Sequence, residues 1–275
     1  MDWIAKGAKR ELKWFVLENV VGILKRKKHE QETFSDQIIA QLLERLPEGW
    51  SIDIQKLNSC DFGVPQSRPR VFIVGVAPEL KSTARQRKVL ALDASAFKVQ
   101  GEVMLEDVLD KRSQPSDFDR LPISQQLNVL MQLDNFHIIG SQYPGIVDIE
   151  RDPLKEVDSG IAVNGTRTLR TNNAGLWILP ATASHAQQYG PRGRFLTWAE
   201  KARLAGMTPC SLKSLSIREV EIAVGNTIPV PMIGAVLTPV LAAWKIFKQR
   251  AHMAQLSLRA LHSCDDDGPE YELVQ

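Results

Sequence analysis

Apolar and polar positions near the start of the chain follow four regular patterns. A short apolar run at residues 14–17 predicts a buried strand. Apolar side chains recur at helical spacing through residues 34–46, and the Pro-Glu-Gly that follows predicts the end of a helix. Residues 50–57 alternate between apolar and polar side chains, and residues 71–76 are continuously apolar, so both predict strands. This order of elements is typical of the second half of a doubly wound or mixed α/β sheet.

The middle of the chain, residues 79–193, has poor periodicity and many scattered Pro, Gly, Asn and Asp residues. Only short regular segments are predicted within it: a helical turn at 103–109, a helix at 123–133 and a strand at 174–179. We therefore interpret this region as an irregular insertion between two parts of the sheet domain.

Regular structure returns towards the C-terminus. Thr197 followed three residues later by Glu200 is a capping box and predicts the start of a helix. A second short helix is expected at 216–224, then a rigid polar turn at 225–231, then a long apolar helix at 232–247.

These patterns predict four regions. Residues 1–80 would be the second half of an α/β sheet domain, residues 81–193 an inserted domain, residues 194–250 the return to the sheet domain, and residues 251–275 a polar tail.

Composition narrows the functional classes. A hydrophobic content of 44% and a charged content of 24% are ordinary for a soluble globular protein, and a net charge of +2 requires any nucleic-acid surface to be a local patch. The three cysteines show neither a metal-binding spacing nor a disulfide framework, so we expect a reducing, intracellular environment and no metal site. No apolar run approaches the roughly 18 residues of a membrane span, and no signal peptide is evident.

The most informative stretch begins at a Gly-Val-Pro turn and presents Gln66, Arg68 and Arg70 at alternate positions. Side chains two apart in an extended segment share a face, so these three could point the same way. Guanidinium groups suit phosphate or a carbonyl edge, although two surface arginines at a sheet edge are the simpler alternative. Glu18 and Asn19 follow the first strand, where ligands collect in open α/β sheets, or are an ordinary capping acid and turn former.

Basic side chains are frequent in the insertion and just after it. The turn at residues 164–168 presents Arg167 between two hydroxyl groups, and Arg170 follows it. This region is either a small solvated domain or a module that reads nucleic-acid edges with its loops. Arg194, just before the capping box, either supports the insertion or contacts phosphate. Further basic residues of the insertion are Arg85, Arg87, Lys88 and Arg112.

Four blocks, in order, resemble the C-terminal half of DNA (cytosine-5) methyltransferases over roughly residues 11–247. They are Glu18-Asn19-Val20, Gln66-x-Arg68-x-Arg70, Arg194-x-Leu196-Thr197-x-x-Glu200-x-x-Arg203-Leu204-x-Gly206, and Gly225-Asn226-Thr227-Ile228-Pro229. Any one block would be weak evidence, but four in register are specific. The resemblance implies part of an S-adenosylmethionine-dependent, Rossmann-like methyltransferase sheet with an inserted target-recognition domain at 81–193.

The chemistry implied by this resemblance is methyl transfer from S-adenosylmethionine to C5 of a cytosine flipped out of double-stranded DNA. Glu18 would bond the N3 and amino edge of the base, Arg70 would hold its O2 carbonyl and position Glu18, and Arg68 would lie beside the pocket. Asn19 and Asn226 would contact the cofactor. The resemblance and the basic turns together make Gln66, Arg167, Arg170 and Arg194 the candidate DNA contacts.

Three parts of the family pattern are missing from this sequence: the Phe-x-Gly-x-Gly cofactor loop, the acidic residue after a second strand that would hold the ribose, and the Pro-Cys nucleophile loop. Cys60 precedes the Gly-Val-Pro turn, Cys210 follows Pro209 in the wrong block, and Cys264 lies in the tail, so none is assigned as the nucleophile. We therefore expect half an active site that needs a complementing N-terminal half or subunit. A truncated gene, a two-chain enzyme and a degenerate copy all fit, and an exposed sheet edge is expected where strands are missing.

Other functions stay open at this point. The chain could be a catalytically inactive module that binds DNA or a protein partner, and a branch of the resembled family methylates tRNA. An unrelated α/β domain without a cofactor would need four accidental motif matches. The enzyme interpretation places the protein inside the cell at DNA, in the nucleus if the source is eukaryotic.

Overall fold

The computed structural model describes residues 1–26, 28, 31–78, 94–111, 118–150, 160–171 and 175–243. The chain divides into two units. The first comprises Met1–Phe62, Pro69–Val99 and Met232–Gln255, and the second comprises Gly63–Arg68, Gln100–Pro231 and Leu256–Gln275. Several expectations lie outside the described residues: the polar tail, the end of the last helix, and Arg85, Arg87, Lys88 and Arg112. The domain boundaries derived from sequence stay predictions.

A three-stranded sheet forms the described centre of the first unit. Its strands are β1 (Trp14–Val20), β4 (Pro69–Val76) and β2 (Ser51–Asn58), in the order β1-β4-β2. The central strand β4 runs antiparallel to both neighbours, so β1 and β2 run parallel to each other. All three predicted strands are confirmed, and the mixed α/β class with them.

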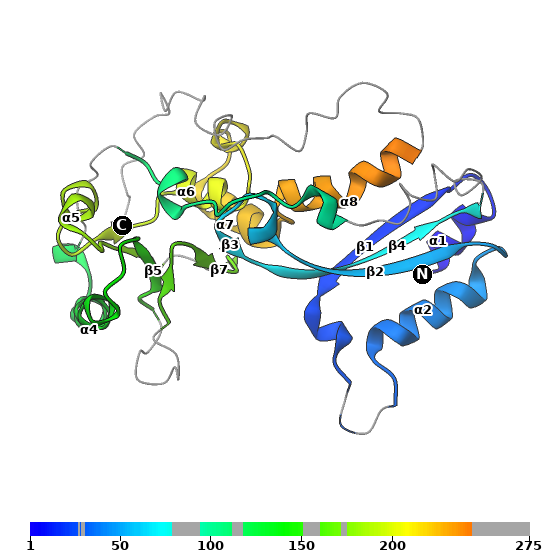
Figure 1. Cartoon of the computed structure of the whole chain (residues 1–275), viewed down its shortest axis with the longest axis horizontal. Coiled ribbons are helices and arrows are strands. Elements are labelled where there is room, and N and C mark those ends of the chain that lie inside the picture. The colour runs from blue at the N-terminus through cyan, green and yellow to red at the C-terminus, as the bar shows by residue number, and fades with distance from the viewer. Residues whose placement is uncertain are drawn as a thin grey trace. The chain divides into compact units, whose positions relative to one another are not determined.

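Helices cover both faces of this sheet (Figure 1). α2 (Phe34–Arg45) lies on one side and α8 (Val230–Ala243) on the other, and the short helix α1 (Asp2–Ala8) completes the unit. Thr33 caps the start of α2, and its hydroxyl accepts a hydrogen bond from the backbone N–H of Asp36. This capping box satisfies backbone donors that the first turn of a helix leaves without partners.

The core of the first unit lies between the sheet and its helices. Strand residues alternate between the faces, and Phe15, Val71 and Ile73 pack on the side of α2. The ring of Phe15 stacks on Trp50, with 5.8 Å between the ring centroids. Gly75 lies opposite Phe15 in the register, and a Cβ there would stand 2.0 Å from the ring. Only a glycine therefore lets the aromatic ring lie flat against β4.

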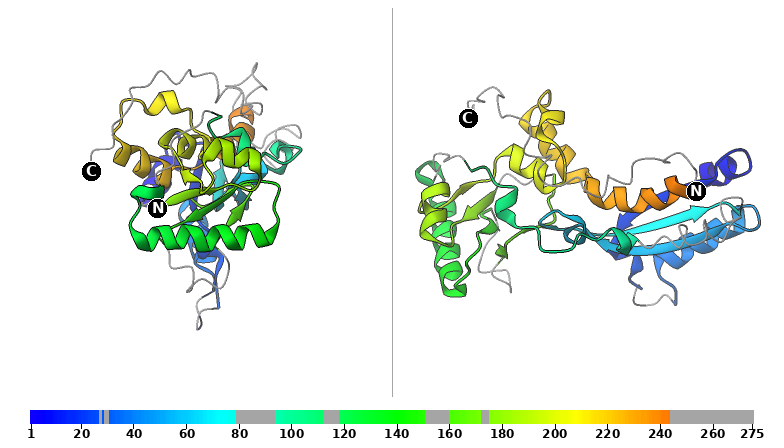
Figure 2. Two further views of the ribbon diagram at one scale, coloured as in Figure 1. Left: turned by 90° about the vertical axis from the view of Figure 1, so that its left-hand side faces the viewer. Right: turned by 45° about the horizontal axis from the view of Figure 1, so that its top comes forward.

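The second unit contains a four-stranded antiparallel sheet in the order β6-β5-β8-β9. Its strands are β6 (Ala162–Val163), β5 (Gly145–Asp148), β8 (Leu176–Leu179) and β9 (Arg194–Phe195). The helix α4 (Ile123–Ile139), green in Figure 2, runs along this sheet and buries Val129, Leu133 and Phe136 in a shared core. The predicted helix at 123–133 and strand at 174–179 are confirmed as α4 and β8. The other three strands, of two to four residues, were not predicted because so short a segment shows no clear periodicity.

The remaining helices and strands of the second unit are shorter. They are α5 (Ala183–Tyr189), α6 (Trp198–Leu204), α7 (Ile217–Asn226) and the parallel pair β3 (Gln66–Ser67) and β7 (Thr166–Arg167). Single turns of 3-10 helix occur in the first unit at Val21–Leu24, Ser59–Phe62 and Ala94–Phe97. In the second unit they occur at Leu105–Asp107, Phe118–Arg120 and Pro209–Leu212.

The C-terminal helices agree with the sequence in type and differ in extent. The capping box of Thr197 and Glu200 is confirmed at α6. α7 continues through Gly225 and Asn226, so the prediction that both belong to a turn was wrong; α7 ends where Thr227 is extended. Among the described residues no single helix could cross a membrane; α7 and α8 meet the length and apolarity criterion only jointly, bent by 46°.

The close approach at Gly75 gives a testable consequence. Gly75→Ala should destabilise the first unit by about 1–3 kcal/mol, because the added methyl group forces Phe15 off β4. Urea unfolding followed by tryptophan fluorescence measures this change. Gly234→Ala in α8 is the matched control, since its Cβ meets nothing within 4 Å and alanine favours a helix. Equal unfolding midpoints for the two variants would contradict the packing described here.

Candidate functional site

Glu18 and Arg70 form an ion pair within the first unit. The register places Glu18 opposite Phe72 and Val20 opposite Arg70, so Glu18 and Arg70 are diagonal neighbours on one face. Arg70 Nε donates to Glu18 Oε1 at 2.7 Å, and the side chains are 12% and 27% exposed respectively. This is the face opposite the one that packs on α2. The two side chains that the sequence predicted to bind a ligand from separate strands are thus in direct contact.

The contacts of Arg70 leave part of its guanidinium group for a ligand. Nη1 donates to the backbone oxygen of Pro69 at 2.9 Å, and Nε is engaged with Glu18. Arginine carries five N–H donors in a fixed plane, so Nη2 can still donate to a carbonyl oxygen brought to this face. The second carboxylate oxygen of Glu18 can accept from an amino group in the same way.

Asn19 lies beside this pair but on the other face of β1. It is exposed, and its Oδ1 accepts a hydrogen bond of 2.8 Å from the backbone N–H of Val20. Asn19 lies opposite Val71 in the register and two residues after Leu17. Both of those side chains belong to the core on the α2 side, so Asn19 is on that face. The side-chain amide of Asn19 still has its two N–H donors pointing away from that bond.

Arg68 belongs to the second unit and does not share a face with Arg70. One residue separates β3 from β4, and these two strands pair in different sheets, so the prediction of one extended segment was wrong. Arg68 is 4% exposed. Nη1 donates to the backbone oxygen of Leu169 at 2.8 Å, and Nη2 donates to that of Gly225 at 2.9 Å. A catalytic role beside a base pocket does not fit these contacts, and that prediction is corrected.

Gln66 and Arg194 were predicted to contact DNA, and their burial corrects both predictions. Gln66 is 1% exposed within β3, and Arg194 is 2% exposed within β9. A side chain enclosed by its own fold cannot reach a phosphate or a base edge unless the unit opens. The alternative for Arg194, support of the inserted region, is the one that the structure shows.

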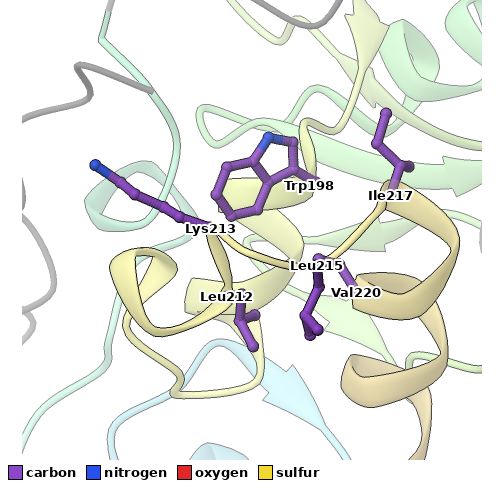
Figure 3. Close-up of a pocket in the computed structure, with 6 residues that line it drawn as sticks. All are labelled: Trp198, Leu212, Lys213, Leu215, Ile217 and Val220. Carbon is purple, nitrogen blue, oxygen red and sulfur yellow. The ribbon is translucent and has the colours of Figure 1, made fainter. Parts of the chain in front are cut away.

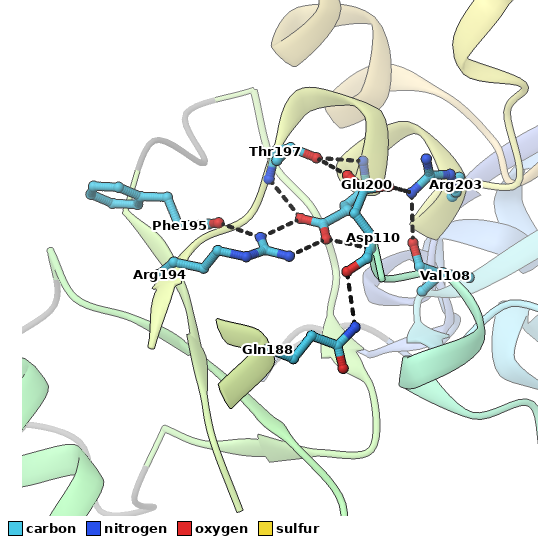
Figure 4. A network of polar contacts seen from close by, with 8 residues as sticks. All are labelled: Val108, Asp110, Gln188, Arg194, Phe195, Thr197, Glu200 and Arg203. Atoms are coloured by element: carbon cyan, nitrogen blue, oxygen red, sulfur yellow. Dashed lines mark hydrogen bonds and ion pairs between the residues drawn. The ribbon is translucent and has the colours of Figure 1, made fainter. Parts of the chain in front are cut away.

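Arg194 makes a two-pronged ion pair with Glu200 (Figure 4). Nη2 lies 2.7 Å from Oε1 and Nη1 lies 2.9 Å from Oε2, while Nη1 also donates to the backbone oxygen of Phe195. Burial lowers the pKa of Arg194, but the hydrogen bonds and charge of Glu200 outweigh burial and raise this pKa overall. The guanidinium group therefore stays charged in the core.

The same carboxylate holds two backbone segments. Glu200 Oε2 accepts from the N–H of Thr197 at 2.8 Å, and Oε1 accepts from the N–H of Asp110 at 2.8 Å. Arg203 adds an ion pair of 2.7 Å with Asp110 and a hydrogen bond to the backbone oxygen of Val108. The sequence marked Glu200 as a helix cap and as a member of the third family block, but no local signal pointed to Asp110, which lies 90 residues away.

The exposed candidates of the second unit lie on two segments that touch. Arg167 and Arg170 are exposed in and after β7, and Asn226 is exposed at the end of α7. A Cβ on Gly225 would stand 2.3 Å from the backbone nitrogen of Thr171 and 2.4 Å from the carbonyl carbon of Arg170. The backbone before Asn226 therefore packs directly on the backbone of Arg170.

The two cysteines in the described residues do not resemble nucleophiles. Cys60 and Cys210 are exposed and form no disulfide. Burial, and then the negative charge of Asp61, raise the pKa of the Cys60 thiol. A catalytic cysteine needs the opposite shift, because the thiolate is the attacking species. Cys264 lies outside the described residues.

One surface hollow in the second unit is too small for a nucleobase or a cofactor (Figure 3). Its volume is about 10 Å³, enough for roughly one water molecule. Its lining is apolar except for one lysine and consists of Trp198, Leu212, Lys213, Leu215, Ile217 and Val220. We assign it to the packing of α6 against α7.

Removal of one partner from the buried ion pair should be costly. Glu200→Ala should reduce the free energy of unfolding by about 3–5 kcal/mol, because Arg194 would be left buried without its carboxylate. Asp119→Ala is the control, since its pair with Arg192 is 90% and 50% exposed and should contribute about 0–1 kcal/mol. Denaturant titration of both variants measures the difference. Similar losses from the two variants would show that the buried pair has no special role.

The raised pKa of Cys60 can be tested by alkylation. The rate of its reaction with iodoacetamide should rise with pH at a higher midpoint than that of N-acetylcysteine amide, which has no charged group beside the thiol, because more alkali is needed to form the thiolate of Cys60. Asp61→Asn should lower this midpoint by removing the nearby negative charge. Mass spectrometry of the labelled peptide follows Cys60 alone. A midpoint below that of the free thiol would reopen Cys60 as a nucleophile.

Known methyltransferases are similar in sequence to parts of this chain. The chain is 45% identical over 64 residues to the Type II methyltransferase M.DdeI of Desulfomicrobium norvegicum, covering 23% of this chain and 15% of that one. It is 34% identical over 118 residues to the Type II methyltransferase M.HgiCII of Herpetosiphon aurantiacus, covering 42% and 23%. The matched stretches thus span less than a quarter of either relative.

Among solved structures, the chain is similar to the Dnmt2 methyltransferase of S. pombe, at 16% identity and a TM-score of 0.49, over 85% of this chain and 67% of that one. A putative DNA modification methyltransferase of an E. coli prophage gives 16% identity and a TM-score of 0.49, over 87% and 72%. The model of the C-5 cytosine-specific DNA methylase family matches residues 8–241. The chain therefore belongs to the C-5 cytosine-specific DNA methylase family.

Proposed function

We propose that this chain acts in the transfer of a methyl group from S-adenosylmethionine to C5 of cytosine in DNA, together with a partner that supplies the nucleophile. The observation that carries the proposal is the ion pair of 2.7 Å between Glu18 and Arg70. It places an acceptor and a fork of donors side by side on one face of β1 and β4. Those are the groups needed to hold the polar edge of a flipped cytosine.

The geometry divides the work between the two side chains. Arg70 donates to the O2 carbonyl through Nη2 and, through Nε, fixes the carboxylate of Glu18. Glu18 accepts from the exocyclic amino group and shares a proton with N3. Electron density drawn towards the N3 edge makes C6 a better electrophile for a thiolate. Both groups are held in place before the base arrives, so little reorganisation is needed.

The described residues supply only part of a site for S-adenosylmethionine, which provides the electrophilic methyl group when bound. Asn19 and Asn226 are exposed amides that suit hydroxyl or carboxylate groups of this molecule. β1 leads directly into the 3-10 turn Val21–Leu24, without the glycine loop at a helix N-terminus that usually cradles such a ligand. We therefore assign the main grip on the methyl donor to the partner.

The edge of β1 is suited to a partner that adds a strand. Edge strands are usually protected by exposed charges or prolines. β2 carries Asp53 and Lys56, whereas β1 carries no lysine or proline, and its one charged side chain, Glu18, is paired with Arg70. A complementing N-terminal half with the Pro-Cys loop would extend the sheet at β1 and bring the cysteine to the pocket.

We propose that double-stranded DNA is contacted by exposed side chains of the second unit. Arg167 and Arg170 lie in and just after β7, on a segment with little regular structure. Two guanidinium groups three residues apart can reach a phosphate or the O6 and N7 edge of a guanine. With Gln66 and Arg194 buried, these two arginines are the retained candidates for target recognition.

A methyl-transfer assay tests this function. The chain is co-expressed with a candidate partner encoding a Pro-Cys loop, and transfer of labelled methyl groups to duplex DNA and to tRNA is measured. Glu18→Gln and Arg70→Ala should each lower kcat by about 100-fold or more, as expected when one preorganised group is lost. Lys56→Ala, on the other face of the sheet, is the control and should retain full activity.

Four results would overturn parts of the proposal. Turnover by the isolated chain would refute the assignment of the nucleophile to a partner. Full activity of Glu18→Gln or Arg70→Ala would reject the roles given to these residues. Methylation of tRNA alone would replace the substrate, and DNA binding without transfer in any complex would favour an inactive recognition module.

A further inference from the structure

Arg68 joins two chain segments that are far apart in the sequence. Its side chain is 4% exposed, and its two terminal nitrogens donate to the backbone oxygens of Leu169 and Gly225. Hydrogen bonds from a charged donor are stronger than those between neutral groups, and a buried carbonyl that loses its donor is costly. One side chain therefore fixes both backbones, 101 and 157 residues further along the chain.

The segment before Leu169 is bound to the same short stretch as Arg68. β3 and β7 pair in parallel, with Gln66 opposite Thr166, and the N–H of Thr166 donates to Pro65. The hydroxyl of Thr168 adds a hydrogen bond of 3.0 Å to the backbone oxygen of Ser67. Residues 166–169 are thus tied to residues 65–68 at nearly every position.

The two segments held by Arg68 also contact each other directly, through Gly225 and the backbone at Arg170 and Thr171. The 2.3 Å between an added Cβ and the nitrogen of Thr171 leaves no room for any side chain. Asn226 follows Gly225 directly, and Arg170 follows Leu169. The exposed candidate contacts for DNA and for the methyl donor are therefore each one residue away from a carbonyl held by Arg68.

We propose that Arg68 is a positioning residue that couples the recognition segment 166–171 to the end of α7. When Arg167 and Arg170 engage DNA, the segment stiffens, and Arg68 passes this restraint to Gly225 and Asn226. The inference rests on the proposed function for the identity of the ligands, but the coupling itself belongs to the chain alone. Through this coupling, DNA binding at Arg167 and Arg170 would restrain Asn226, the proposed contact for the methyl donor.

Amide hydrogen exchange of the full chain without ligand tests the coupling first. Arg68→Met should raise the exchange rates of residues 166–171 and 225–228 together by about tenfold or more, because both segments lose a charge-assisted bond. Arg68→Lys should raise exchange at 225–228 more than at 166–171, because lysine lacks the planar fork that makes both bonds, whereas residues 166–168 keep their other bonds to residues 66 and 67. Arg218→Met, an exposed arginine on α7, is the matched control and should change neither segment.

A second arm adds a DNA duplex of on the order of 20 base pairs, long enough to cover a protein of this size. In the unmodified chain the duplex should slow exchange at 166–171 and at 225–228. In Arg68→Lys the protection should persist at 166–171 and disappear at 225–228, which a merely structural arginine would not cause.

The outcomes separate the two proposals. If Arg68→Met loosens one segment or neither, or if Arg68→Lys still transmits protection, Arg68 does not couple them. If the duplex fails to bind the unmodified chain, the proposed function fails, and the ligand-free result still decides the coupling. Should Arg68→Met not fold, the ligand-free exchange of Arg68→Lys and of Gly225→Ala, which wedges the two backbones apart, decides it instead.

Discussion

The buried hydrogen bonds of the Glu200 carboxylate hold three segments of the second unit together. This carboxylate accepts two hydrogen bonds from Arg194 and one each from the backbones of Thr197 and Asp110, with no exposure to solvent. Taking a carboxylate and a guanidinium group out of water costs several kcal/mol for each, so the arrangement is stable only when every bond is made. The start of α6, strand β9 and the segment at Asp110 are consequently fixed relative to one another.

Two of the ion pairs in the described residues show how exposure decides what the same pair of charged groups is used for. Arg194 and Glu200 are 2% and 0% exposed, and their donors and acceptors are directed at the protein itself. Arg70 and Glu18 are 12% and 27% exposed, and part of each group remains directed outwards. The first pair therefore determines architecture, and the second is suited to a ligand. Sequence motifs alone do not distinguish them, because both are arginine and glutamate in a family block.

Much of the first unit followed from the sequence, because its elements are long enough for a pattern. Strands of seven and eight residues and a helix of twelve show their periodicity, and Thr197 with Glu200 marked a helix start. In the second unit only β8 of the four-stranded sheet was predicted, since Gly145–Asp148 and the other two strands are too short to show a pattern. The pairing of Glu18 with Arg70 was expected from the resemblance. The burial of Gln66, Arg68 and Arg194 was not predicted. Arg68, for example, is held by Leu169, which lies 101 residues further along the chain, and no local pattern records such a contact.

The change of unit between Arg68 and Pro69 has a consequence for dissecting this protein. The strand partner of β7 and the guanidinium group that holds Leu169 come from residues 63–68, whereas the rest of the second unit begins at Gln100. A contiguous fragment of 100–231 would lack the stretch that anchors its recognition segment, and a fragment ending at Arg68 would lose β4 from the first sheet. Neither unit can be isolated by a single cut, so a minimal version of either needs a graft or a rearranged chain order.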